Sequence, residues 1–247
     1  MAGFQQGRFR HGAREFLEAG TQNGRESKAM TVVRRTATAL AIAALAVLAI
    51  IYVPAKWFVP ITAFLAALAI VEYALLLRRK IRGLFAYAAL LALGAAVLVC
   101  ALSALPAIAS KSGNLMLLYT VAIVKISDMG GFAFGLSSAR LMKGGNHKLC
   151  PSVSPNKSWE GLFGSLFGSC LVSCCFMPVT GFSWGRSLAF GIVAALLGTL
   201  GDLAESKFKR WAGVKDSSAM RFTNGMGGIL DMLDSLLIAP SAILAFF

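Results

Sequence analysis

The chain has 247 residues, of which 57% are apolar and only 14% are charged, and its mean hydropathy is +0.71. Soluble domains carry about 25% charged residues, so this composition excludes soluble barrels, sandwiches and doubly wound folds. A disordered chain and a disulfide scaffold are excluded as well. The net charge of +13 would suggest nucleic acid in a soluble protein, but in a membrane protein it first indicates basic cytoplasmic loops.

The first 33 residues are polar, basic and interrupted by glycine. They lack the apolar content needed to fold alone, so we predict a disordered cytoplasmic tail over 1–33. Met30 lies just ahead of Arg34 and Arg35, and a translation start at Met30 is one hypothesis.

Seven apolar stretches follow, each close to the roughly 20 residues that cross a bilayer. We therefore expect an all-α, polytopic integral membrane helical bundle of about seven transmembrane helices. The predicted spans are 36–53, 57–77, 84–105, 115–136, 159–179, 187–205 and 228–247.

The predicted spans differ in character. Residues 34–112 are rich in Ala, Leu, Val and Ile, with Glu72 as the only acid, and we expect them to form a lipid-facing scaffold. Residues 113–247 carry glycine, serine and charge within the spans, and we expect a catalytic transmembrane region with cytoplasmic loops.

The basic residues fix the expected orientation. With the amino terminus in the cytoplasm, nearly all Lys and Arg fall on the inner side, and only Lys56, Lys111 and Arg186 fall outside. This agrees with the positive-inside rule. The positive charge is thus explained by topology, and no nucleic-acid partner is expected.

The acids of the carboxyl-terminal half lie at the polar ends of spans or in adjoining loops, where an ionised carboxylate is costly and indicates a functional site. Asp202 and Glu205 are three residues apart, as are Asp231 and Asp234, so each pair can share one helix face. The acids concerned are Asp128, Glu160, Asp202, Glu205, Asp216, Asp231 and Asp234.

Basic residues lie close to these acids in the sequence. Carboxylates can hold Mg²⁺ while cations neutralise phosphate oxygens, which is typical of phosphoryl or nucleotidyl transfer. For Glu205 and Lys209, spaced i,i+4, a simple surface salt bridge is an equally good interpretation. No phosphate-binding loop, nucleophile elbow or H-E-x-x-H motif is present, and His147 is the one histidine placed for catalysis.

Several ordered motifs resemble the phosphatidate cytidylyltransferase family, also called CDP-diacylglycerol synthases. The segment from Ser154 to Gly161 is similar to the family's S-P-x-K-[ST]-x-E-G element. The likeness continues through Gly201 to Arg210, Lys215-Asp216 and the run from Gly227 to Ser235. It covers about residues 120–240.

The resemblance implies that CTP condenses with phosphatidate to give CDP-diacylglycerol and pyrophosphate. It implies Mg²⁺ as cofactor, with a second, monovalent cation such as K⁺ left open, and a bacterial inner-membrane location with the active site facing the cytoplasm. A homodimer is also left open.

The implied catalytic residues are Asp216, Asp231, Lys215 and Lys157. The implied metal ligands are Asp216, Asp231, Asp202 and Asp234. The implied substrate-binding residues are Ser154, Lys157, Ser206, Lys209, Arg210, Lys215 and Asp128.

Three alternatives remain open. A polyprenol kinase or an ether-lipid cytidylyltransferase would use similar metal and phosphate groups. A transporter could be lined by the intramembrane charges, although their concentration toward the cytoplasmic side favours an enzyme. An inactive scaffold is the third, because Met226 and Met232 stand where the family has His and Arg.

Overall fold

The computed structural model of the protein describes residues 41–142, 144–214 and 228–244. The chain divides into two units, Met1–Ala49 and Ile50–Phe247. Of the first unit only the start of the helix Ala41–Tyr52 is described. The tail predicted over 1–33, including Met30, therefore lies outside the described residues.

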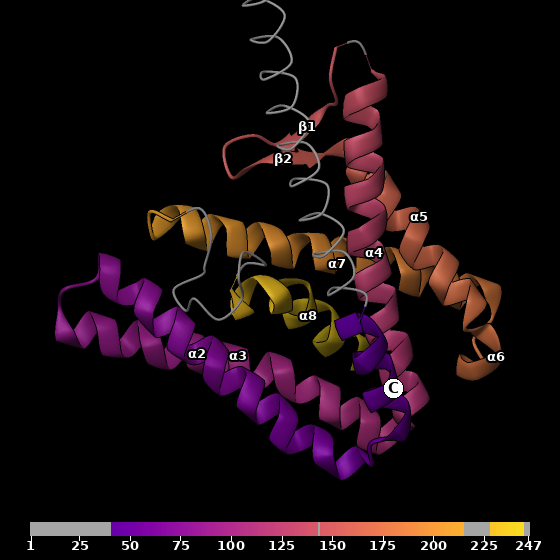
Figure 1. Ribbon diagram of the computed structural model, residues 1–247, viewed down its shortest axis with the longest axis horizontal. Helices are drawn as coiled ribbons and strands as arrows, with labels where there is room; N and C mark the ends of the chain where they lie inside the picture. The colour runs from indigo at the N-terminus through magenta and orange to yellow at the C-terminus, as the bar shows by residue number, and fades with distance from the viewer. Residues whose placement is uncertain (1–40, 143, 215–227, 245–247) are drawn as a thin grey trace, which may run out of the picture. The chain divides into compact units, whose positions relative to one another are not determined.

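In its described part, the second unit is built almost entirely from helices (Figure 1). Its elements are η1 (Ala55–Trp57), α2 (Phe58–Lys80), α3 (Leu84–Ser112), α4 (Asn114–Leu141), β1 (Lys148–Cys150), β2 (Ser154–Ser158), α5 (Trp159–Cys175), α6 (Met177–Thr180), α7 (Trp184–Trp211) and α8 (Ile229–Leu244).

The predicted all-α membrane fold is confirmed, but the count of seven spans is not. Within the described ranges, four helical segments are long and apolar enough to cross a membrane: Ala55–Lys80, α3, α4 and α7. The stretch predicted to span over 159–179 divides after Cys175, because α5 ends there and the separate helix α6 begins at Met177, with Pro178 in its first turn. This leaves α5 with 17 residues, while α8 has 16.

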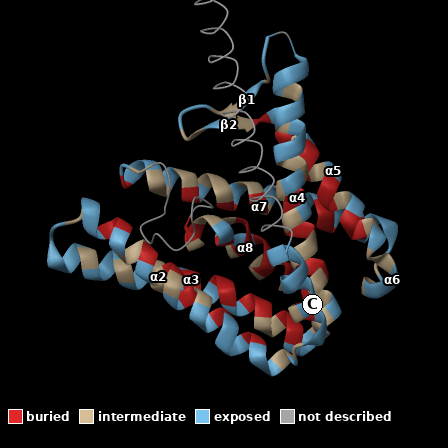
Figure 2. Ribbon diagram, in the orientation of Figure 1, coloured by how far each residue is buried: buried red, intermediate tan, exposed pale blue. Residues whose placement is uncertain are grey.

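The helices pack in pairs. In Figure 1, α2 and α3 lie side by side, α4 runs along α5, and α7 contacts both α5 and α8. Figure 2 shows buried residues where these helices meet and exposed residues along the outer faces of α2 and α3. The buried aromatic Tyr119 on α4 donates to or accepts from the Ser173 hydroxyl of α5 at 2.8 Å.

Glycine allows α4 and α5 to approach closely. A Cβ added at Gly164 would meet the carbonyl oxygen of Gly130 and lie 2.5 Å from Cβ of Phe134. No side chain fits there, so the two backbones touch directly, as small residues permit in membrane helices. The Ser127 hydroxyl donates to the Ser165 carbonyl across the same interface at 3.2 Å.

A two-stranded antiparallel hairpin connects α4 to α5, and the sequence patterns did not predict it. Lys148 pairs with Ser158, and Cys150 with Ser154. The hairpin leads directly into α5, because the Ser158 hydroxyl accepts the Gly161 N–H at 3.1 Å and so caps the helix. The S-P-x-K segment therefore forms a strand rather than an irregular loop.

Candidate active site

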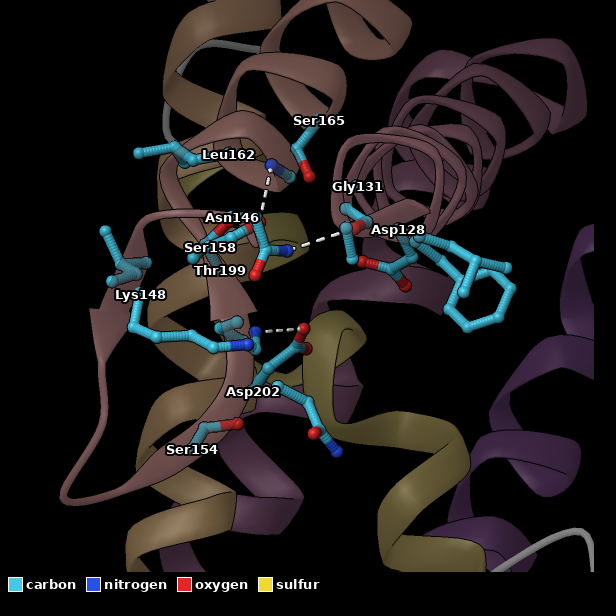
Figure 3. A pocket seen from close by; sticks show the side chains of 18 residues that line it. Asp128, Gly131, Asn146, Lys148, Ser154, Ser158, Leu162, Ser165, Thr199 and Asp202 are labelled. Carbon is cyan, nitrogen blue, oxygen red and sulfur yellow. Dashed lines mark hydrogen bonds and ion pairs between the residues drawn. The ribbon is translucent and has the colours of Figure 1, made fainter. Parts of the chain in front are cut away.

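A cavity of about 480 Å³ lies between the hairpin, the carboxyl-terminal half of α4, the first turns of α5 and the middle of α7 (Figure 3). Its size falls within the range of small-molecule sites. The residues that line it are Asp128, Gly131, Phe132, Gly135, Leu136, Ala139, Asn146, Lys148, Leu149, Ser154, Asn156, Lys157, Ser158, Gly161, Leu162, Ser165, Thr199 and Asp202.

An ion pair across the cavity joins the hairpin to α7. Lys157 Nζ of β2 lies 2.6 Å from Asp202 Oδ2, and each side chain is 23% exposed. The other carboxylate oxygen, Asp202 Oδ1, is buried and accepts no hydrogen bond from the described residues. A buried carboxylate oxygen in this state is available to a further cation or donor.

A polar network next to this pair joins α4 to α8. Ser235 is fully buried, and its hydroxyl donates to Asp128 Oδ2 at 2.7 Å. Lys125 Nζ donates to the Ser235 hydroxyl at 3.0 Å and to the Met232 carbonyl at 3.1 Å. Neither Lys125 nor Ser235 was among the site residues expected from the sequence. The signal for Lys125 was its position as a cation inside an apolar helix.

Three carboxylates gather here from different helices. Asp128, Asp202 and Asp234 repel one another electrostatically in every pair, and Lys125 and Lys157 are the adjacent cations. Such a concentration of acids at low exposure is unfavourable unless further positive charge enters. Within the described ranges, however, no group of three or more His, Cys, Asp or Glu side chains is close enough to share an ion.

A second charged cluster lies where α7 meets α8. Lys209 Nζ is 2.8 Å from Glu205 Oε2 and also bonds Asp231 Oδ1. The side chains of Lys209, Glu205 and Asp231 are only 13%, 5% and 17% exposed. The interpretation of Glu205 and Lys209 as a surface salt bridge is therefore wrong, since the pair is buried and shared with α8.

The amino end of α8 is held by two carboxylates. Asp231 Oδ2 accepts the Gly228 N–H at 3.0 Å, in the manner of a capping box. Gly228 itself has no side chain to cap the helix, and Glu72 of α2 takes that role by accepting the Leu230 N–H at 2.8 Å. Glu72 is 1% exposed. The prediction that residues 34–112 are only lipid-facing scaffold is thus wrong at this residue.

Two contacts fix the hairpin to the helices. His147 Nδ1 lies 2.7 Å from Glu160 Oε1, which also accepts the His147 N–H at 3.1 Å. These hydrogen bonds from His147 lower the pKa of the Glu160 carboxyl to about 2. The Asn146 side chain donates from Nδ2 to the Gly135 carbonyl of α4 at 3.0 Å.

The structure brings some of the expected site residues together and not others. Ser154, Lys157, Asp128 and Asp202 line the cavity. Asp231 and Lys209 form the second cluster, and Asp234 is near the first. Ser206 is half-buried and Arg210 exposed on α7, and neither lines the cavity. Lys215, Asp216 and Met226 lie outside the described residues.

Other cavity residues were missed by the sequence reasoning. They are Asn146, Lys148 and Thr199. None of them belongs to the motifs quoted above, and only the fold brings them to the cavity. The hairpin places the first two, and Thr199 lies one helical turn before Asp202 on α7.

The family model described as "Cytidylyltransferase family" matches residues 12–247. Three curated relatives, each named phosphatidate cytidylyltransferase, match a shorter part of the chain. The Staphylococcus aureus (strain COL) protein is 42% identical over 123 residues, covering 49% of this chain and 44% of the relative. The Staphylococcus haemolyticus (strain JCSC1435) protein is 42% identical over 133 residues, covering 52% and 48%. The Staphylococcus epidermidis (strain ATCC 35984 / DSM 28319 / BCRC 17069 / CCUG 31568 / BM 3577 / RP62A) protein is 43% identical over 130 residues, covering 51% and 46%.

The matched segment thus spans about half the length of these curated relatives. The family match, by contrast, extends over nearly the whole chain. It includes all the helices that carry the cavity and the second charged cluster. The chain therefore belongs to the cytidylyltransferase family, as the motifs predicted.

Proposed function

We propose that the protein is a phosphatidate cytidylyltransferase, which condenses CTP with phosphatidate to form CDP-diacylglycerol and pyrophosphate. The observation that carries the proposal is the partly buried Lys157–Asp202 pair in a cavity that Asp128 also lines. Cations and carboxylates from separate elements meet there at low exposure, as a site for charged phosphates requires. The family match and the names of the relatives support the same reaction.

The proposed reaction is a single displacement at phosphorus. An oxygen of the phosphatidate phosphate forms a bond to the α-phosphorus of CTP, and the bond from that phosphorus to the oxygen bridging to the β-phosphorus breaks. Pyrophosphate leaves with the electron pair. A phosphate monoester is already anionic near neutral pH, so this step needs no strong general base. This fits the cavity lining, in which the described residues include no histidine.

Lys157 and Lys209 are the proposed phosphate-binding cations. Lys157 lines the cavity with Lys148, so an entering phosphate would exchange part of its hydration for ammonium groups. Lys209 is held between Glu205 and Asp231. Because two carboxyl groups already occupy this lysine, we expect a phosphate to approach that cluster only together with a further cation.

Two buried oxygens suit Mg²⁺, but among the described residues no three His, Cys, Asp or Glu side chains are close enough to share an ion, so the proposed site also needs Asp216. Asp202 Oδ1 and Glu205 Oε1 are buried oxygens without hydrogen-bond partners among the residues that the structure describes, and Mg²⁺ prefers such hard oxygen ligands. The residues proposed to hold it are Asp202, Asp231, Asp234 and Asp216. When bound, the ion would neutralise charge on the nucleotide phosphates. In this proposal, the carboxylates of the chain hold that positive charge beside the cavity.

We further propose that the carboxyl-terminal ends of α2, α4 and α7 face the cytoplasm of a bacterial inner membrane. The basic residues Arg78, Arg79 and Lys80 end α2, while Arg140 lies in the last turn of α4 and Arg210 in that of α7. Positive charge at these ends agrees with the positive-inside rule. CTP would then enter from the water while phosphatidate stays in its leaflet.

The test is pyrophosphate release by the purified full chain in detergent, with CTP and phosphatidate, with and without Mg²⁺. We expect release that requires both substrates and the ion, together with a lipid product that carries the nucleotide. A lipid monophosphate formed from a dolichol-like alcohol would instead support a polyprenol kinase. Transfer to an ether lipid in preference to phosphatidate would support the ether-lipid enzyme. Absence of any product, with ion flux through reconstituted vesicles, would support a transporter.

A further inference from the structure

We propose that the cavity beneath the hairpin binds the pyrimidine base of the nucleotide, and that Asn146 selects cytosine over uracil by accepting a hydrogen bond from the exocyclic 4-amino group. This inference rests on the proposed function, because it names the part of CTP that occupies the cavity.

The side-chain amide of Asn146 is held in one orientation. Its Nδ2 donates to the Gly135 carbonyl of α4 at 3.0 Å. Rotating the amide by half a turn would set Oδ1 against that carbonyl oxygen, and two acceptors repel. Nothing in the described part of the chain donates to Oδ1. Figure 3 shows Asn146 extending between Ser158 and Gly131, so Oδ1 is a fixed acceptor at the cavity.

A fixed acceptor distinguishes the two pyrimidines. Cytosine carries an amino group at ring position 4, which donates hydrogen bonds, whereas uracil, like thymine, carries a carbonyl oxygen there, which accepts them. Opposite Oδ1 the amino group forms a hydrogen bond, while the carbonyl oxygen leaves two acceptors facing each other. The same amide orientation thus favours CTP and disfavours UTP.

The cavity offers groups for a base as well as for phosphates. Ser154, Asn156 and Thr199 supply neutral donors and acceptors, and Leu136 and Leu162 supply apolar surface for the faces of a ring. Phosphates instead need cations, and Lys148 and Lys157 also line this cavity. Lys157 lies against Asp202, so we assign the phosphates to that part of the cavity and the base to the part next to Asn146.

The test compares two variants that both lose the bond to Gly135 but differ in the acceptor. Asn146→Ala removes Oδ1, and Asn146→Asp keeps a carboxylate acceptor in its place. The measurements are kcat/KM for CTP and for UTP, KM for phosphatidate, and direct binding of each nucleotide to the full chain in detergent without lipid substrate. Ser152→Ala, in the hairpin turn and outside the cavity lining, is the matched control.

We expect Asn146→Ala to reduce the preference for CTP over UTP by about tenfold, the size of one neutral hydrogen bond, with KM for phosphatidate unchanged. Asn146→Asp should bind both nucleotides more weakly because of its charge, yet keep the preference for CTP. Ser152→Ala should match the wild type.

Three results would overturn the inference: an unchanged preference in Asn146→Ala, an equal loss of preference in both variants, or a rise in KM for phosphatidate in place of CTP. The second would mean that Asn146 only anchors the hairpin, and the third that the cavity holds the lipid headgroup. Failure of the wild type to release pyrophosphate would overturn the proposed function instead, while nucleotide binding without lipid would still test the base assignment.

Discussion

The helix pair α2 and α3 and the group α4, α5, α7 and α8 are both apolar enough for a bilayer, but they use their polar groups differently. In the pair, serine and threonine hydroxyls bond carbonyls of their own helix: Thr62 to Phe58, Ser103 to Cys100 and Ser110 to Ala107. Two tyrosine hydroxyls, Tyr73 to the Leu90 carbonyl and Tyr87 to the Ala74 carbonyl, join the two helices. In the group, several serine hydroxyls cross between helices: Ser127 to Ser165, Ser169 to Gly191 and Ser235 to Asp128.

This difference shows which polar contacts determine how the membrane helices are arranged. A hydroxyl bonded within its own helix adds nothing to the contact with a neighbour, whereas a bond between buried groups of two helices helps to hold one helix against the other. The charged groups of the site lie in the second region, on helices that such serine bonds join. Glu72 is the exception, since it belongs to α2 and caps α8.

The largest expected effect tests whether the second region carries the chemistry. Asp231→Asn should lower turnover by a hundredfold or more, as losses of charge stabilisation at active sites commonly do, and kcat for pyrophosphate release measures it. Arg79→Gln, an exposed charge change at the end of α2, should stay within about twofold of wild type. Near-normal turnover of a folded Asp231→Asn protein would remove this residue from the site.

The next prediction concerns the contact that places α8 against α7. A Cβ at Gly201 would lie 2.6 Å from the Asp234 carbonyl oxygen, so Gly201→Ala should push the helices apart. We expect a loss of about 1–3 kcal/mol in stability from overpacking and a fall in kcat of about tenfold or more, as misplaced catalytic groups cause. Thermal unfolding and pyrophosphate release measure the two effects.

Gly198 offers a matched control one turn earlier on α7. A Cβ there would meet no other atom within 4 Å, so Gly198→Ala should keep the wild-type activity. Equal behaviour of the two variants would show that close contact at Gly201 does not position Asp234.

Glu72 tests the link between the two regions. Glu72→Ala leaves the Leu230 N–H buried without this acceptor and should cost about 1–3 kcal/mol of stability, with a fall in kcat larger than any change in KM. Glu72→Gln keeps an acceptor and should restore most of the loss. Val71→Ala, on the exposed face of the same helix, serves as control, and no rescue by Gln would contradict the capping role.

The smallest effect is expected at the hairpin. His147→Ala removes the ring contact with Glu160 but keeps the backbone hydrogen bond, so KM for CTP should rise only a few-fold, as for a half-exposed interaction. Steady-state kinetics at fixed phosphatidate measure it. A fall in kcat with unchanged KM would instead point to a part for His147 in the reaction itself.

Sequence reasoning was most successful where chemistry is local. Hydropathy predicted an all-α membrane fold, and the motifs predicted the family. The expectation that acids of the carboxyl-terminal half meet basic residues is met by Lys157 with Asp202 and by Lys209 with Asp231. Lys157 and Asp202 lie far apart in the chain. The motifs predicted that both belong to one site, but not that they form an ion pair.

The missed features depend on contacts between elements. In the sequence, Glu72 is a single acid within an apolar stretch. Only the position of α8 in the fold shows that its carboxylate accepts the Leu230 N–H. Asn146 belongs to no motif, and its role follows from the hairpin that brings it to Gly135. The metal ligands stay a prediction, since Asp216 lies outside the described residues.

The shortness of α5 has a consequence for the surrounding lipid. With 17 residues, the helix rises about 25 Å, whereas the hydrocarbon core of a bilayer measures about 30 Å. Were α5 to cross the bilayer, such hydrophobic mismatch would draw the headgroup plane inward around the helix. The hairpin at the amino end of α5 would then lie where the membrane is locally thinner. There a lipid phosphate could meet a dissolved nucleotide while the acyl chains of the lipid stay in the leaflet.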